Sequence, residues 1–204
     1  MSGAAVVVPA AGRGERLGPG VPKALRPLNG VPMLVHAIRA MIAAPSVGLV
    51  VIAAPEDGVG EVQRALDEHG LADSGSSSAS LVVVAGGDTR QESVARALLV
   101  IPDEVDVVLV HDAARPLATS ALVESVISAV RSGADAVVPG IGVVDTIKSV
   151  DEAGRVIGTL DRSALRAVQT PQGFRRSVLT AAHAAADPRL PATDDAGLVE
   201  ALGC

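Results

Sequence analysis

Short apolar runs alternate with amphipathic stretches along most of the chain. The apolar runs lie at 5–9, 49–53, 81–85, 105–110 and 136–139, and stretches with helical spacing lie between them at 33–44, 59–69, 91–100 and 119–131. Strands that are apolar throughout are buried on both faces, which is typical of a parallel sheet. The pattern therefore predicts an α/β fold in one domain over 1–204, with a mostly parallel sheet and helices on both of its faces.

The segment 143–169 interrupts this alternation. Two strands are predicted at 146–150 and 155–160, around a turn at 151–154 that ends in Gly154. A β-hairpin that projects from an α/β core is suited to dimerisation. A hairpin packed on its own domain fits the same residues equally well.

Composition excludes several classes of protein. The net charge is −6 and Phe174 is the only aromatic residue, which argues against a nucleic-acid binder. No apolar stretch approaches the roughly 20 residues of a membrane span, and no basic segment precedes the first apolar run. Cys204 is the only cysteine and cannot form an internal disulfide, which suits the reducing cytoplasm.

The first loop, AAGRGERLGPGVPK at 10–23, carries the strongest chemical signal. Gly12 and Gly14 allow backbone N–H groups to approach an anion closely, directly after a strand. Arg16 and Lys23 follow and can supply positive charge to phosphates. The loop therefore predicts a nucleoside triphosphate site.

Two commoner phosphate loops do not fit. The dinucleotide pattern G-x-G-x-x-G requires glycine where the chain has Leu17, and the tripeptide G-K-[S/T] of the P-loop does not occur. A nicotinamide-dependent oxidoreductase is therefore a distant alternative.

A second candidate motif, VHDAARP at 110–116, follows a buried strand. Mg²⁺ takes few protein carboxylates together with water and substrate phosphates, so Asp112 is the candidate metal ligand. Asp112 as a helix cap is the alternative, which Pro116 and the later start of the next helix disfavour. Arg115 could hold a phosphate, and we expect His111 to be structural.

Five further motifs occur in the chain, and three of them have both a chemical and a plain structural interpretation. GGDTRQES at 86–93 could approach a ligand through its glycines, with Ser93 donating to a ribose or base, but it is equally good turn and capping chemistry. DTIK at 145–148 and DR at 161–162 could bind an acceptor phosphate or form surface ion pairs. QTPQGF at 169–174 follows the hairpin, and TDDA at 193–196 predicts a helix start capped by Thr193.

Taken together and in this order, the motifs resemble the 2-C-methyl-D-erythritol 4-phosphate cytidylyltransferase family. The resemblance implies a Rossmann-like domain with a β-arm at about 143–169, and a homodimer formed through that arm. It implies Mg²⁺ as cofactor, with CTP and methylerythritol phosphate as substrates. A phosphate oxygen of the acceptor would attack the α-phosphorus of CTP, and pyrophosphate would leave.

The resemblance also assigns roles by position. CTP would meet the backbone of the first loop, the cytosine would lie near the second loop, and the acceptor phosphate would meet the arm. The residues of the first loop are Ala10, Ala11, Gly12 and Gly14, and those near the cytosine are Gly87, Asp88 and Ser93. The acceptor phosphate would meet Thr146 and Arg162, with help from Arg115 and with Arg162 reaching across the dimer. Arg16 and Lys23 would stabilise the transition state, and Asp112 would bind Mg²⁺.

Two further expectations concern the end of the chain and the alternative functions. Members of the family continue past the equivalent of Cys204 with a strand and a helix that carry an aspartate and a lysine, so we expect the sequence to be incomplete. A ribitol 5-phosphate cytidylyltransferase and a non-catalytic nucleotide-binding protein remain the alternatives. The residues 111–116 and 169–172 favour the methylerythritol enzyme over the first, and the retained Arg16, Lys23 and Asp112 count against the second.

Overall fold

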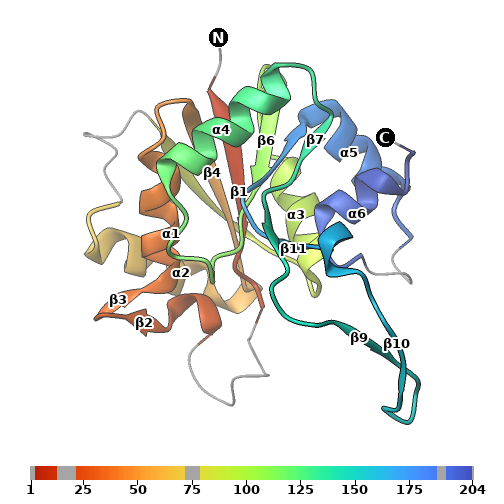
Figure 1. Ribbon diagram of the computed structural model, residues 1–204. Coiled ribbons are helices and arrows are strands. Elements are labelled where there is room, and N and C mark those ends of the chain that lie inside the picture. Colours follow the sequence, from red (N-terminus) through yellow and green to blue (C-terminus); the bar gives the residue numbers. More distant parts are fainter. Residues whose placement is uncertain (1–2, 13–21, 72–78, 188–191, 204) are drawn as a thin grey trace.

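The computed structural model describes residues 3–12, 22–71, 79–187 and 192–203. A six-stranded sheet with helices on both faces forms its centre (Figure 1). The strand order is β5-β4-β1-β6-β12-β7, and the bounds are Ser80–Ala85, Val47–Ala54, Ala4–Pro9, Val107–Val110, Gln172–Arg175 and Ala136–Val137. Among these described strands β12 runs opposite to the other five, so the expected mostly parallel sheet is confirmed.

The alternating side chains of β1 separate two hydrophobic cores. Val6 and Val8 face one core, while Ala5 and Val7 face the other. The first core is closed by α1 (Met33–Ile42), α2 (Val59–Glu68) and α4 (Ser120–Arg131), and the second by α3 (Arg90–Leu98), α5 (Arg176–Ala185) and α6 (Asp195–Glu200). Because both faces are covered, the central strands β1 and β6 are apolar at every position, which is the pattern that predicted the sheet.

Small two-stranded sheets lie outside the central one. The predicted hairpin is present as β9 (Lys148–Val150) and β10 (Val156–Thr159), and Figure 1 shows it projecting away from the layered core. At its base β8 (Gly140–Gly142) pairs with β11 (Arg166–Val168), and near the first loop β2 (Pro27–Leu28) pairs with β3 (Val31–Pro32). Short 3-10 turns lie at η2 (Lys23–Leu25), η3 (Glu56–Gly58) and η5 (Arg162–Ala164).

Within the described residues, no helix is both long enough and apolar enough to span a membrane.

Candidate active site

The carboxyl ends of β1, β5 and β6 carry the three predicted loops to one edge of the sheet. Ala10 is buried, and its N–H donates to the carbonyl of Ala53 at 2.8 Å, which holds the start of the first loop against the end of β4. Gly12 is exposed beyond it. Lys23 begins η2 with an exposed side chain. Gly14 and Arg16 lie outside the described residues.

Gly86 brings the second loop against the first. A Cβ atom at Gly86 would lie 2.8 Å from Ala11 Cβ and 2.8 Å from Ser93 Oγ, distances that real Cβ atoms do not show. The Gly86 N–H also donates to the carbonyl of Ala54 at 2.7 Å. The close approach of the two loops therefore requires glycine here.

The loop between β5 and α3 is held by its own side chains. Ser93 is buried, accepts a hydrogen bond from Gly87 N–H at 3.1 Å and donates to the Thr89 carbonyl at 2.8 Å. Thr89 caps α3 by accepting from Glu92 N–H, and Glu92 accepts from Asp88 N–H at 3.0 Å. The capping interpretation is confirmed, and the nucleotide-binding roles of Gly87, Asp88 and Ser93 stay predictions.

Asp112 follows β6 and meets two guanidinium groups. Arg90 Nε lies 3.4 Å from its Oδ1, and Arg115 Nε lies 3.3 Å from its Oδ2. Its N–H donates to Thr170 Oγ1 at 3.1 Å. The carboxylate is 35% exposed, and Thr119 caps the next helix, so Asp112 is not a helix cap.

The Asp112 carboxylate is the group at this site that fits a magnesium ion. The described residues contain no group of three histidine, cysteine, aspartate or glutamate side chains that could enclose a metal. Mg²⁺ is commonly bound by one or two carboxylates, with substrate phosphates and water completing its octahedron. A single, partly exposed carboxylate at a strand end is such a donor set.

His111 is structural, as expected. Its side chain is fully buried, with Nε2 3.2 Å from the Arg115 carbonyl and Nδ1 3.0 Å from Thr170 Oγ1. Burial lowers the pKa of His111 to about 4, despite the neighbouring Asp112 carboxylate, so the ring is neutral at pH 7. Its contacts fix the backbone on both sides of Asp112.

Two residues of this site, Arg90 and Asp195, were not predicted from the sequence. Arg90 Nη1 donates to Asp195 Oδ2 at 2.6 Å, and His183 Nε2 lies 2.9 Å from Asp195 Oδ1. Burial would raise the pKa of Asp195, but the His183 hydrogen bond and the Arg90 charge outweigh it, and the pKa is lowered. The position of Arg90, two residues after Asp88 in the glycine loop, was the available signal.

The predicted cap of the last helix is wrong by one residue. Asp194, not Thr193, caps α6, because its Oδ1 accepts from Gly197 N–H at 3.0 Å. Its other oxygen accepts from Gln172 Nε2 at 2.8 Å, so the cap is also tied to β12. This leaves Asp195 in the first turn facing inward rather than toward solvent.

The predicted acceptor residues lie on the arm. Thr146 and Arg162 are both exposed, and Arg162 Nη1 donates to the Val144 carbonyl across the base of the hairpin. Arg115 instead belongs to the Asp112 loop, where its Nη1 donates to Gln169 Oε1. Arg115 thus lies beside the candidate metal ligand, whereas Thr146 and Arg162 belong to the arm.

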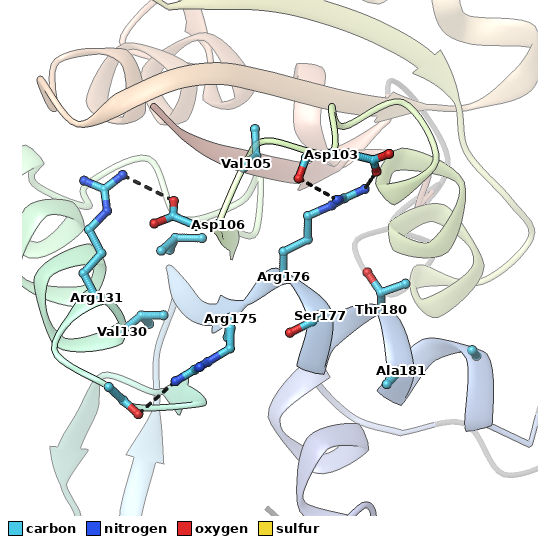
Figure 2. Close-up of a pocket in the computed structure, with 13 residues that line it drawn as sticks. Asp103, Val105, Asp106, Val130, Arg131, Arg175, Arg176, Ser177, Thr180 and Ala181 are labelled. Carbon is cyan, nitrogen blue, oxygen red and sulfur yellow. Dashed lines mark hydrogen bonds and ion pairs between the residues drawn. The ribbon is translucent and has the colours of Figure 1, made fainter. Parts of the chain in front are cut away.

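A cavity of about 820 Å³ lies at the opposite end of β6, between α4 and α5 (Figure 2). Three arginines line it, and each pairs with an aspartate: Arg131 with Asp106 (3.5 Å), Arg175 with Asp135 (3.1 Å) and Arg176 with Asp103 (2.8 Å). The cavity is lined by residues at the start of β6, Val105 to Val107, whereas Asp112 follows the end of that strand. The cavity is therefore separate from the three loops.

The fold and the loops define an α/β protein with three post-strand loops at one edge of the sheet, where open α/β sheets bind ligands. A family model described as 2-C-methyl-D-erythritol 4-phosphate cytidylyltransferase matches residues 4–204. The cytidylyltransferase of Streptomyces coelicolor is 54% identical over 205 residues, which cover 98% of this chain and 74% of that protein. The chain belongs to the 2-C-methyl-D-erythritol 4-phosphate cytidylyltransferase family.

Solved structures agree with this assignment. The crystal structure of 2-C-methyl-D-erythritol 4-phosphate cytidylyltransferase from Thermus thermophilus matches with a TM-score of 0.74 and 35% identity, covering 98% of this chain and 85% of that one. The 4-diphosphocytidyl-2C-methyl-D-erythritol synthase of Anaerococcus prevotii, at 23% identity and a TM-score of 0.81, shares the fold.

Proposed function

We propose that the chain transfers CMP from CTP to 2-C-methyl-D-erythritol 4-phosphate, giving 4-diphosphocytidyl-2-C-methyl-D-erythritol and pyrophosphate in the non-mevalonate route to isoprenoids. Membership of the family supports the reaction. The structural observation that carries the proposal is the contact of three post-strand loops, through Ala11 and Gly86 on one side and Arg90 and Asp112 on the other. Ligands of open α/β sheets bind beyond the carboxyl ends of the strands, where these loops lie.

In this proposal the first two loops bind CTP. Backbone groups of the first loop contact the phosphates, the second loop receives the cytosine, and two cations act on the α-phosphate. The first-loop residues are Ala10, Ala11, Gly12 and Gly14, and the residues at the cytosine are Gly87, Asp88 and Ser93. The two cations are Arg16 and Lys23. The acceptor phosphate is already an anionic nucleophile, so the protein has to offset charge repulsion rather than generate a nucleophile.

Asp112 would hold Mg²⁺. The ion, when bound, would neutralise charge on the triphosphate and on the departing pyrophosphate. Arg90 and Arg115 lie 3.4 Å and 3.3 Å from the two oxygens of Asp112, which is longer than the usual N–H···O range, so neither guanidinium holds the carboxylate tightly.

The acceptor site in this proposal is completed by a second copy of the chain. The arm exposes large apolar side chains that its own domain does not cover, at Val144, Val150, Val156, Ile157 and Leu160. Apolar surface of this kind marks a protein interface. We place the acceptor phosphate against Thr146 and Arg162, with Arg115 beside it and Arg162 reaching across a homodimer.

The test is release of pyrophosphate from CTP in the presence of Mg²⁺, with methylerythritol 4-phosphate or ribitol 5-phosphate as acceptor. Release only with methylerythritol phosphate supports the proposal. Release only with ribitol phosphate would show that the chain is a ribitol 5-phosphate cytidylyltransferase instead. CTP binding without release with either acceptor would favour a non-catalytic nucleotide-binding protein.

A further inference from the structure

Arg90 is shared between two carboxylates from distant parts of the chain. Its Nη1 donates to Asp195 Oδ2 at 2.6 Å, whereas its Nε lies 3.4 Å from Asp112 Oδ1. The first contact is a short, charge-assisted hydrogen bond, and the second is longer than the usual N–H···O range. The guanidinium is therefore held chiefly by Asp195 and only loosely by the candidate magnesium ligand.

Asp195 is itself fixed by contacts that do not involve Arg90. Its side chain is 1% exposed, and its Oδ1 accepts a hydrogen bond from His183, whose ring is also buried. Because an ionised carboxylate can only accept, Nε2 of His183 carries the hydrogen. The adjacent Ala196 N–H donates to Gln172 Oε1 at 3.4 Å. Asp195 is thus a fixed anchor for the guanidinium.

We propose that Asp195 is a positioning residue that restrains Arg90 and so keeps the Asp112 carboxylate accessible to Mg²⁺. The inference rests on the proposed function, in which Asp112 is the metal ligand. A guanidinium released from Asp195 would approach Asp112 and form a bidentate pair, the geometry that arginine and carboxylate prefer. Such a pair, together with Arg115 at Oδ2, would leave neither Asp112 oxygen open to the ion.

The test compares CTP binding by calorimetry in MgCl₂ and in EDTA, without acceptor. The ratio of the two dissociation constants is the magnesium-dependent gain in affinity. In Asp195→Asn we expect this gain to fall about tenfold, as for other groups that support metal ligands. The affinity for CTP in EDTA should change less than about twofold, because Asp195 does not contact the nucleotide in this scheme.

The matched control is Asp194→Asn. It removes the same charge one residue away, and asparagine still caps a helix, so the gain should stay at the wild-type value. An equal loss in both variants would show a general charge effect and would overturn the proposal.

A double-mutant cycle tests whether Asp195 acts through Arg90. In an Arg90→Gln background, Asp195→Asn should change the gain less than about twofold. An equal loss in both backgrounds would overturn the restraint. Asp195→Ser replaces Asp195→Asn in the same cycle if thermal unfolding shows that the asparagine variant does not fold.

Wild-type controls separate this proposal from the proposed function. Pyrophosphate release by the wild-type enzyme tests the activity, whatever Asp195 does. Normal release, together with an unchanged gain in Asp195→Asn, would overturn the role of Asp195 alone. No magnesium-dependent gain in the wild-type enzyme would overturn the assignment of Asp112 and this inference with it.

Discussion

At the scale of single residues, two cations, Arg16 and Lys23, are assigned to the transition state. Of these two, Lys23 lies in the part of the chain that the structure describes. Lys23→Ala should lower kcat by about 10²–10³ while leaving the dissociation constant for CTP close to the wild-type value, because the charge acts most on the α-phosphate as it reacts. Steady-state kinetics and calorimetry measure the two quantities. Arg64→Ala, an exposed cation on α2, is the control and should leave kcat unchanged. A normal kcat in Lys23→Ala would remove Lys23 from the mechanism.

His111 should make stability depend on pH. Its pKa is about 4 in the folded chain and about 6.5 when unfolded, so the unfolded chain binds the proton more readily. Its contribution to the free energy of unfolding is complete above pH 6.5 and is lost as the pH falls toward 4, by about 3 kcal/mol in all. His111→Asn should remove this part of the pH dependence in urea unfolding, whereas His36→Gln should not. An unchanged slope in His111→Asn would contradict the assignment.

The chemistry of the site could be predicted from the sequence where it depends on neighbours along the chain. Asp112 was identifiable because it lies two residues after an apolar run that ends at Val110. The Arg90–Asp195 pair could not be found in this way, since its partners lie 105 positions apart and meet only when α3 and α6 cover the same face. Asp195 also has the local pattern of an exposed first-turn acid, and burial reverses that interpretation.

At the scale of elements, the contact between the first two loops depends on Gly86. Gly86→Ala would press a methyl group against Ala11 and Ser93 at 2.8 Å, so one of the loops must move. We expect CTP affinity to fall about tenfold or more, because the backbone donors are displaced. Gly60→Ala is the matched control, since nothing lies within 4 Å of its Cβ, and alanine should stabilise α2 by up to about 1 kcal/mol. Equal CTP affinity in the two variants would show that the loop contact is unimportant.

The arm should carry the dimer interface. Ile157 is 68% exposed on β10, and an aspartate there would have to be desolvated in an interface but stays solvated in a monomer. Ile157→Asp should therefore shift the mass measured by light scattering from dimer to monomer without a change in circular dichroism. Asp151→Asn alters the turn instead of the apolar face and is the control. A dimer that persists in Ile157→Asp would place the interface elsewhere.

Apolar runs and stretches with helical spacing were predicted within a few residues, whereas β12 and α5 were missed. The five apolar runs, the two hairpin strands and the four helical stretches all correspond to observed elements. β12 was not predicted, because its four residues, QGFR, lack both a long apolar run and a clear alternation. Its register is set by pairing with β6 and β7 on either side, and only the folded sheet supplies those partners.

At the scale of the whole molecule, the separation of Thr146 and Arg162 from the Asp112 loop has a consequence for assembly. These two residues flank β9 and β10, the hairpin that Figure 1 shows projecting from the core, while Asp112 follows β6 of the central sheet. If the arm serves the partner's site, each active site combines residues of two chains. In a symmetric dimer, the arm of each subunit then completes the active site of the other.

Mixing two inactive variants shows whether Arg162 acts in the active site of the partner subunit or in that of its own chain. In a heterodimer of Lys23→Ala with Arg162→Ala, arm exchange gives one site both substitutions and the other site neither. Random re-association of equal amounts should then recover about a quarter of wild-type activity at limiting acceptor concentration, since half of the dimers are mixed and each has one intact site. If Arg162 serves its own chain, every site carries one substitution and mixing recovers nothing. Activity in the mixture is thus direct support for an acceptor site shared between subunits, and its absence would confine Arg162 to its own subunit.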